Sequence, residues 1–311
     1  MALSFAGNLS LCLGFLLCSW ALHATPRTLP EASTEQKFEQ WIHEHGRTYV
    51  DGAEKVNRFK IFVDNLRFIE DFNHTGNRTF KLGSNAFSDL TVEEFLAIHT
   101  GLSLPPVRRN SPRTMSLLRA NVTDVPDSID WVEKGAVNAI KNQGPCGCCW
   151  AFSTIAAVES ITQIKTGNLP ELSEQQLVDC TSRNNGCNGG WMDTTFEYIV
   201  QNGGITSEAN YPYQKADGTC DTSAASSIEA TITSYKDVPT NNEGELLKAV
   251  GNATGFDSPR RKRAGTPIVL KRHLQWCGTA MTHAVTIVGY GTTEDGTKYW
   301  KIRNSWGETW G

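Results

Sequence analysis

The chain lacks the features that nucleic-acid-binding and membrane-spanning proteins need. Its formal net charge is −4, and its one dense basic run is at residues 260–263, so we expect no extended positive surface that could bind a nucleic acid. Its one long apolar stretch, residues 9–22, is too short to span a bilayer. With 39% hydrophobic residues among 311, the chain can bury more than one core. These absences predict a globular protein without nucleic-acid or membrane partners.

The N-terminal apolar stretch is typical of a secretory signal peptide, because it is short and small residues follow it. We expect the signal peptide to occupy residues 1–24, with cleavage near Ala21 or Ala24. Glycosylation sequons are compatible with passage through the secretory route, and they lie at Asn73, Asn77, Asn121 and Asn252. The sequence therefore predicts a secretory-route glycoprotein.

Histidine is scarce, with seven residues, and the nine cysteines do not group into paired C-x-x-C runs with neighbouring histidines. A zinc site needs such a grouping of thiolate and imidazole ligands. We therefore expect no metal and no organic cofactor.

One cysteine lies where a helix begins. The run Gln-Gly-Pro-Cys-Gly-Cys-Cys-Trp-Ala-Phe-Ser starts at Gln143, and apolar residues then recur at helical spacing as far as Gly167, which predicts a buried helix over residues 149–166. At the N-terminus of this helix, unpaired N–H groups and the positive end of the dipole favour a thiolate. Cys149 is therefore a candidate nucleophile, although an isolated cysteine is more often a small buried hydrophobic residue.

A thiolate nucleophile needs a base and a group that orients the base. Only His273 and His283 follow Cys149 in the chain. Asn304, in Asn-Ser-Trp-Gly, is the best orienting candidate, because an amide oxygen fixes the tautomer of an imidazole without competing for its charge. The sequence thus predicts a Cys–His–Asn arrangement.

These motifs resemble those of papain-like cysteine peptidase precursors, and the pair Cys148-Cys149 is similar to the plant branch that includes senescence-associated vacuolar peptidases. The resemblance implies a nucleophile (Cys149), a general base and acid (His283), an orienting residue (Asn304) with Trp306 covering it, and an oxyanion donor (Gln143) that acts with the backbone N–H of Cys149. His273 lies in a stretch that does not match the family, so we exclude it as the base.

The resemblance also implies a binding site for an extended peptide. The segment Cys187-Asn-Gly-Gly190 is similar to the one that pairs with substrate, and Gly189 and Gly190 would let the two main chains approach closely. By the same resemblance the pocket for the P2 side chain has four wall residues: Trp191, Met192, Met281 and Ala284. We therefore expect peptide or protein substrates with an apolar or aromatic P2 residue.

Two motifs ahead of the cysteine resemble the inhibitory propeptide of this family. The first is a helical stripe with residues three or four apart: Glu54, Arg58, Phe62, Asn65, Ile69 and Asn73. The second is Gly-Ser-Asn-Ala-Phe-Ser-Asp at residues 83–89. The chain's own propeptide is thus its expected inhibitor, passing through the cleft of a monomeric zymogen. Release by acid would fit a vacuole or lysosome, and an extracellular location stays open.

The domain boundaries follow from these motifs and from composition. We expect an inhibitory propeptide domain at residues 32–100, a proline-containing linker at 101–124 and a peptidase domain at 125–311. The resemblance implies an α+β fold, with a helical left domain and a β-barrel-like right domain. Helices are predicted after Ser173, which with Gln176 forms a capping box, and over residues 192–201. Strands are predicted over residues 231–235, 284–288 and 298–302.

The remaining cysteines suggest disulfides in an oxidising compartment. By resemblance, Cys146 pairs with Cys187 and Cys180 with Cys220. Cys148 stands where the family usually has Ser or Ala, and it is either a free thiol or the partner of Cys277.

The chain departs from the family at residues 252–276 and stops at Gly311, where the family continues. A frame slip or misassigned exon would produce the first departure, and an inserted loop with a basic processing site is the alternative. A truncated barrel would expose strand edges and fold poorly. Two functional alternatives stay open: an inactive product whose propeptide inhibits related peptidases, and a storage or defence protein, against which the four intact site residues count.

Overall fold

The computed structural model describes residues 29–75, 81–103, 125–239, 241–251, 269–270 and 281–310. The predicted signal peptide, residues 104–124 of the linker, His273, Cys277 and most of the unmatched 252–276 segment lie outside these residues. The chain forms two compact units, residues 1–90 and 91–311. Within the described ranges, no helix combines the length and apolar character that crossing a bilayer requires.

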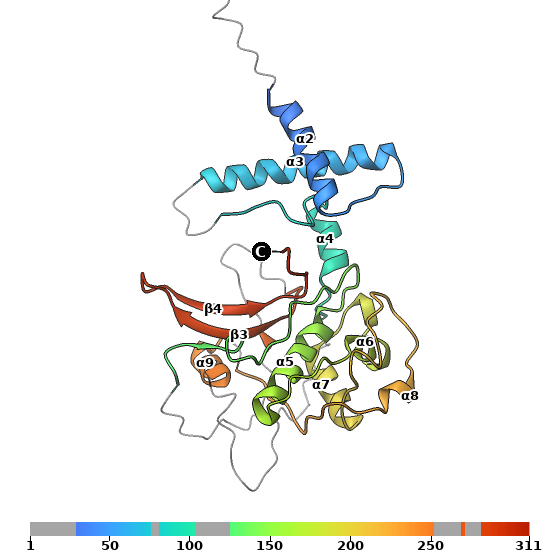
Figure 1. Ribbon diagram of the computed structural model, residues 1–311, viewed down its shortest axis with the longest axis vertical. Helices are drawn as coiled ribbons and strands as arrows, with labels where there is room; N and C mark the ends of the chain where they lie inside the picture. Colours follow the sequence, from blue (N-terminus) through green and yellow to red (C-terminus); the bar gives the residue numbers. More distant parts are fainter. Residues whose placement is uncertain are drawn as a thin grey trace, which may run out of the picture. The chain divides into compact units, whose positions relative to one another are not determined.

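The first unit is built on α2 (Leu29–Glu44) and α3 (Gly52–His74), which cross one another (Figure 1). α3 begins after Asp51, whose side chain accepts a hydrogen bond from the Glu54 N–H and so satisfies one of the first unpaired donors. Phe38 and Trp41 of α2 pack against Phe62 of α3, and all three side chains are buried. An aromatic core thus holds this small helical unit together.

The polar residues of the α3 stripe bind the segment that follows the helix. Asn65 Nδ2 donates to the carbonyl oxygens of Ser88 and Leu90 at 2.9 and 3.0 Å. The Asn73 side chain makes two hydrogen bonds to the main chain of Leu82, each 2.8 Å long, and Arg58 donates to the Asp89 carbonyl. The predicted long helix is confirmed, and its stripe supplies partners for backbone groups of a segment without regular structure.

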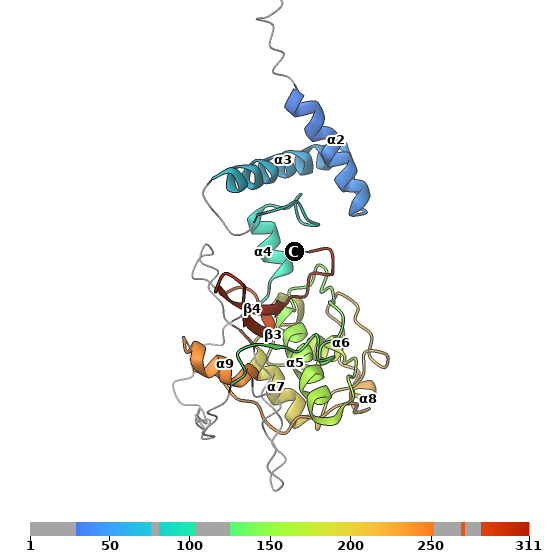
Figure 2. The ribbon, with the colours of Figure 1, turned by 60° about the vertical axis from the view of Figure 1, so that its left-hand side comes forward.

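The second unit contains the remaining helices: α4 (Val92–His99), α5 (Cys149–Thr166), α6 (Glu174–Cys180), the 3₁₀ turn η1 (Gly186–Asn188), α7 (Met192–Gln201), α8 (Thr222–Ala225) and α9 (Glu243–Gly251). α4 begins with a capping box, in which Thr91 and Glu94 each bond the other's backbone N–H. α5 contacts strand β3 as well as α6 and α7 (Figures 1 and 2). It is buried over most of its length, as the sequence predicts.

A small antiparallel sheet completes the second unit, with strands β1 (Ile129–Asp130), β2 (Val269–Leu270), β3 (Val285–Thr292) and β4 (Lys298–Arg303). β3 is the centre, because β1, β2 and β4 all pair with it. Gly289 pairs with Asp130, and a Cβ at Gly289 would lie 2.4 Å from the Ile129 carbonyl oxygen. Only glycine therefore lets β1 approach this closely.

Two of the three predicted strands are confirmed as β3 and β4, but the strand over residues 231–235 is wrong. A single bridge, between Ile205 and Ala230, precedes this stretch, and residues 231–235 have no regular structure. Ile232 is buried in the core, and Tyr235 stacks on Phe196 of α7. The apolar residues of this stretch are thus buried by packing in the core and on α7, without a strand ladder.

The capping box predicted at α6 is half wrong. The Ser173 side chain accepts a hydrogen bond from the Gln176 N–H, as expected for a cap. Gln176 does not reach back, however: its Nε2 donates to Tyr198 Oη and its Oε1 accepts from the Thr206 N–H. The buried amide joins α6 to neighbouring segments, where it satisfies groups that water cannot reach.

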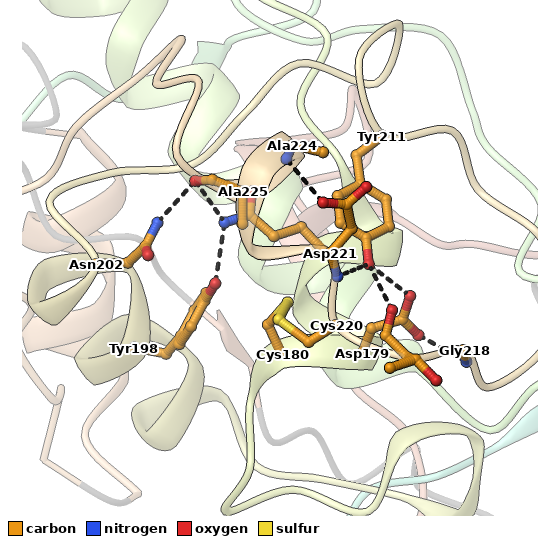
Figure 3. The surroundings of a disulfide bond; sticks show 12 residues. Asp179, Cys180, Tyr198, Asn202, Tyr211, Gly218, Cys220, Asp221, Ala224 and Ala225 are labelled. Atoms are coloured by element: carbon orange, nitrogen blue, oxygen red, sulfur yellow. Dashed lines mark hydrogen bonds between the residues drawn. A yellow bond between two sulfur atoms is a disulfide. The ribbon is translucent and has the colours of Figure 1, made fainter.

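In the described part of the second unit, two disulfides cross-link the chain. Cys146 bonds to Cys187 across 41 residues, and Cys180 to Cys220 across 40. Beside the second bond, Tyr211 Oη donates to Asp179 Oδ2 at 2.9 Å and accepts from the Asp221 N–H (Figure 3). The loop that carries Cys220 is therefore fixed to α6 by hydrogen bonds as well as by sulfur. Cys148 is not part of either disulfide and has a free, buried thiol.

Candidate active site

Cys149 is the first residue of α5 and is fully buried. Its Sγ accepts a hydrogen bond from the Ala284 N–H at 3.4 Å, so the segment that contains His283 lies against the sulfur. Burial raises the pKa of the Cys149 thiol to about 12, and the N–H groups of Ala284 and Trp150, which favour the thiolate, do not offset it. In this state the sulfur is therefore protonated, in contrast to the thiolate that its position at the helix N-terminus favours.

The fold brings the side chains of His283 and Asn304 into direct contact, which the number of residues between them does not show. His283 Nε2 lies 2.7 Å from Asn304 Oδ1, and because that oxygen can only accept, Nε2 must hold the hydrogen. The other ring nitrogen, Nδ1, is buried and has no hydrogen-bond partner among the described residues. The imidazole thus presents an unprotonated nitrogen in a buried site, and burial lowers the pKa of His283 to about 4.

Trp306 covers this pair. Its ring stacks on the His283 ring with centroids 4.3 Å apart and planes 22° from parallel. Its Nε1 donates to the His99 carbonyl oxygen at 3.0 Å. The indole therefore shields the His283–Asn304 hydrogen bond from water and also contacts the last residue of α4.

Gln143 is fully buried and held on several sides. Its Oε1 accepts from Ser305 Oγ at 2.6 Å, which leaves Nε2 as the group that can face a ligand. Nε2 donates to the Cys146 carbonyl at 2.8 Å and more weakly to the His99 carbonyl at 3.3 Å. A main-chain oxygen from residue 99 therefore takes the hydrogen bond that this amide could donate to a substrate oxygen.

The segment after α4 runs between two strips of main chain. On one side the N–H groups of Gly101 and Leu102 donate to the Thr282 carbonyl oxygen at 3.0 and 2.9 Å. On the other side Leu102 and Gly190 form a parallel bridge, with Ser103 N–H donating to the Gly190 carbonyl and Gly190 N–H to the Gly101 carbonyl. The segment therefore pairs with Gly190, at which the sequence predicts that an extended peptide substrate binds.

Gly101 has to be a glycine in this arrangement. A Cβ on Gly101 would lie 1.8 Å from the Gly147 carbonyl oxygen, far inside van der Waals contact. A Cβ on Gly189, whose φ is +115°, would lie 2.4 Å from Ser103 Oγ. The close approach of the two chains thus depends on glycine on both sides.

The predicted wall residues of the P2 pocket share an apolar cluster with Leu102. Leu102 is buried in one apolar cluster with Trp191, Met192 and Ala284, and Met281 packs against the same cluster. Of the six predicted substrate-binding residues, Gly189 and Gly190 thus lie directly against the segment at residues 101–103, and the other four belong to or pack against the cluster that buries Leu102. Sequence reasoning placed the end of the blocking segment at residue 100, because the short stretch Gly-Leu-Ser has no periodicity that would extend it.

A buried group of charges behind the site was also missed. Lys141 Nζ lies 2.9 Å from Glu174 Oε1 and 3.2 Å from Glu159 Oε1, and Arg303 lies 3.5 Å from the other Glu159 oxygen. Burial raises the pKa of Glu174 to about 8. Burial by itself lowers the pKa of Lys141, but the attraction of Glu174 and Glu159 outweighs burial, so the pKa of Lys141 is raised. Isolated charges on separate segments give no sequence pattern, so only the fold brings these four together.

Comparison with known families gives two matches along the chain. Residues 125–311 match the model of the papain family cysteine proteases, and residues 38–95 match that of the cathepsin propeptide inhibitor domain. The senescence-specific cysteine protease SAG39 of Oryza sativa subsp. japonica is 44% identical over 303 residues, covering 95% of this chain and 87% of that protein.

Solved structures of precursors agree. The recombinant stem bromelain precursor has a TM-score of 0.75 and 41% identity, covering 90% of this chain and 89% of its own. The ragweed pollen allergen Amb a 11, a cysteine protease in its proform, has a TM-score of 0.75 and 36% identity, covering 90% of this chain and 87% of its own.

Proposed function

The chain belongs to the papain family of cysteine proteases and is a cysteine endopeptidase made as a self-inhibited zymogen, and we propose how its residues perform that function. Cys149 is the nucleophile, His283 the base and acid, and Asn304 the residue that orients the base. The observation that supports this assignment best is the 2.7 Å contact between His283 Nε2 and Asn304 Oδ1, which leaves Nδ1 unprotonated and able to take a proton from Cys149. The neighbouring Ala284 N–H contacts the Cys149 sulfur at 3.4 Å.

The reaction proceeds through an acyl-enzyme. Cys149 Sγ attacks the scissile carbonyl carbon after its proton moves to His283 Nδ1, and the carbonyl oxygen becomes an oxyanion. Gln143 Nε2 and the Cys149 backbone N–H donate to that oxyanion, and such a donor contributes about 3 to 4 kcal/mol in the transition state. His283 then protonates the leaving amine, which departs as the tetrahedral intermediate collapses. In the second half, His283 removes a proton from water, which attacks the thioester and frees Cys149.

The segment at residues 99–103 keeps this machinery inactive in three ways. The His99 carbonyl takes the hydrogen bond of the oxyanion donor Gln143, and Leu102 fills the apolar cluster that would receive a P2 side chain. The bridge between Leu102 and Gly190 is parallel, whereas a substrate chain running the other way would pair antiparallel. The inhibitory segment thus blocks the substrate site. Because it runs in the opposite direction to a substrate, its own peptide bonds are not placed for attack by Cys149.

The substrates are peptides and proteins with an apolar P2 residue. Leu102 supports this, because its branched aliphatic side chain is buried in the same apolar cluster as Trp191, Met192 and Ala284. The aromatic and thioether walls would also accept an aromatic P2 side chain.

The enzyme works as a monomer in an acidic compartment of the secretory route, a vacuole or lysosome. Two observations support this location: the disulfides Cys146–Cys187 and Cys180–Cys220, which form in oxidising compartments, and the buried His283, whose low pKa makes acid unfavourable for the closed state.

One experiment tests the assignment of the nucleophile. The full chain is brought to acidic pH with a thiol reductant and then labelled with an epoxide inhibitor of papain-like thiols. We expect labelling of the wild type and of Cys148→Ser, and none of Cys149→Ala. Labelling that persists in Cys149→Ala contradicts the assignment, and a chain that stays unlabelled while inhibiting a related peptidase supports the inhibitor hypothesis instead.

A further inference from the structure

The hydroxyl of Tyr213 lies between the two segments that supply the proposed oxyanion donors. Its Oη donates to the Gln143 carbonyl oxygen at 2.7 Å and lies 3.0 Å from Cys148 Sγ. Gln143 supplies the side-chain donor, and Cys148 belongs to the peptide whose N–H, that of Cys149, is the other donor. One side chain therefore contacts both halves of the site from outside it.

The hydrogens in this contact can be assigned. The Gln143 carbonyl can only accept, so the single hydroxyl hydrogen of Tyr213 must point to it. The Cys148 S–H is then the donor to Tyr213 Oη, which has lone pairs to spare. Burial raises the pKa of the Cys148 thiol, and burial raises the pKa of the Tyr213 hydroxyl, so both groups keep their hydrogens in the working pH range. The result is a directed chain, from Cys148 through Tyr213 to Gln143.

The tyrosine is itself held in place. Its backbone N–H donates to Glu208 Oε1 at 2.8 Å, and its ring meets the Phe152 ring of α5 edge-on, with centroids 5.0 Å apart. The hydroxyl is therefore fixed relative to α5, whose first residue is Cys149, and not only relative to the loop at Gln143. A rigid support of this kind is what a pair of oxyanion donors requires, because small displacements of a donor cost much of its effect.

We propose that Tyr213 is a positioning residue for the oxyanion hole, holding the Gln143 loop and the Cys148–Cys149 peptide in register through its hydroxyl. It does not touch the substrate or the reacting atoms. This role rests on the proposed function and adds to it a residue far from Cys149 in sequence. It also assigns a function to Cys148, whose thiol is the buried donor to the same hydroxyl.

The test uses the full chain, activated by acid with a thiol reductant, and compares Tyr213→Phe with Tyr198→Phe as a matched control. Tyr198 is another half-buried tyrosine and lies on α7. Its hydroxyl accepts a hydrogen bond from Gln176 Nε2 at 3.0 Å. For Tyr213→Phe we expect kcat for a peptide substrate to fall about tenfold with KM changed less than about twofold, the pattern of a lost transition-state interaction. Tyr198→Phe should leave both constants unchanged.

Two further readouts separate positioning from a general structural role. A peptide aldehyde forms a tetrahedral adduct that uses the oxyanion donors, so its affinity should fall about tenfold in Tyr213→Phe. Alkylation of Cys149 by iodoacetamide needs a reactive thiolate but no oxyanion donor, so its rate should stay within about twofold of the wild type. Equal loss in both readouts would mean that Tyr213 merely supports the fold and would overturn the proposal.

The Cys148 variants decide the matter even if Tyr213→Phe fails to fold. Cys148→Ser keeps a donor to Tyr213 and should bind the aldehyde within about twofold of the wild type, whereas Cys148→Ala should bind it about threefold more weakly. In a Tyr213→Phe background, Cys148→Ala should have no further effect. Serine and alanine variants with the same affinity overturn the proposal. A wild type that hydrolyses no peptide overturns the proposed function itself, a result that the variant comparisons do not produce.

Discussion

At the scale of single residues, the state of the site depends on burial rather than on residue type. His283 is held by Asn304 and covered by Trp306, and the thiol of Cys149 is out of contact with water. Both residues are neutral here, because a buried ion without full solvation is costly. Once the segment at residues 99–103 leaves, both side chains meet water, and a thiolate and an imidazolium can form and stabilise one another.

This argument predicts a pH dependence that belongs to His283. Its pKa is about 4 in the folded chain and 6.5 in an exposed histidine. The stability contributed by the neutral ring is therefore present above pH 6.5 and is lost as the pH falls through about 4, by a total on the order of 3 kcal/mol. The melting of full-length Cys149→Ala should show this loss, and the same chain with His283→Gln should lack it.

The difference between these two chains is the quantity to measure, because other groups also titrate in this range. Glu174, with a raised pKa of about 8, stabilises the fold as the pH falls and is common to both. Parallel stability curves from pH 7.5 to 4 would contradict the prediction for His283.

At the scale of elements, the extended segment after α4 is the one whose fit depends most on small side chains. It makes main-chain hydrogen bonds to Thr282 and to Gly190, and it passes Gly147 with no room for a Cβ at Gly101. Main-chain hydrogen bonds of this kind tolerate many side chains. The residue that limits which side chains the bound segment can have is therefore Gly101, where there is no space for a Cβ.

Gly101→Ala should therefore weaken latency. The added methyl would meet the Gly147 carbonyl oxygen, so the segment has to move out of its place and expose Cys149. We expect iodoacetamide to alkylate Cys149 of the unprocessed chain at neutral pH at least about tenfold faster than in the wild type. Gly83→Ala is the matched control, because nothing lies within 4 Å of a Cβ there. An alkylation rate equal to that of the control would show that the segment does not protect the thiol.

At the scale of the molecule, buried charges join the helical part of the second unit to its sheet. Glu159 of α5 accepts from Lys141, from the Leu172 N–H and from Arg303 at the end of β4. Its side chain is fully buried, so each of these contacts is made out of water. Such a group contributes little net stability when intact, but removing one partner leaves a buried charge unpaired.

Glu159→Gln should accordingly destabilise the whole second unit by about 3 kcal/mol, because Lys141 and Arg303 lose their shared carboxylate. Urea unfolding of full-length Cys149→Ala, with and without the substitution, measures this loss. Lys165→Gln is the control, since Lys165 is an exposed residue near the end of the same helix. A loss no larger than that of the control would mean that the cluster is hydrated or replaceable.

The sequence by itself determined the helices with clear periodicity, the strands β3 and β4 and the cysteine at a helix start, whereas the order of propeptide and protease was implied by the resemblance to family motifs. Local patterns sufficed for these, because spacing along the chain sets which side chains share a face of a helix or strand. It failed at residues 231–235, where Tyr235 packs on α7 and no strand forms, and at Gln176, whose amide makes hydrogen bonds to distant segments.

Only the tertiary structure decided what the site is doing. It placed His283 beside Asn304 and Cys149 under Ala284, closed the site with Gly101 and Leu102, and brought Tyr213 to Gln143 and Cys148. The family resemblance implied the pairing of His283 with Asn304 and a propeptide in the cleft, but the contacts of Gly101, Leu102 and Tyr213 join segments that no local pattern connects. The protonation states followed from the same contacts, since the pKa of a buried group depends on what excludes water from it.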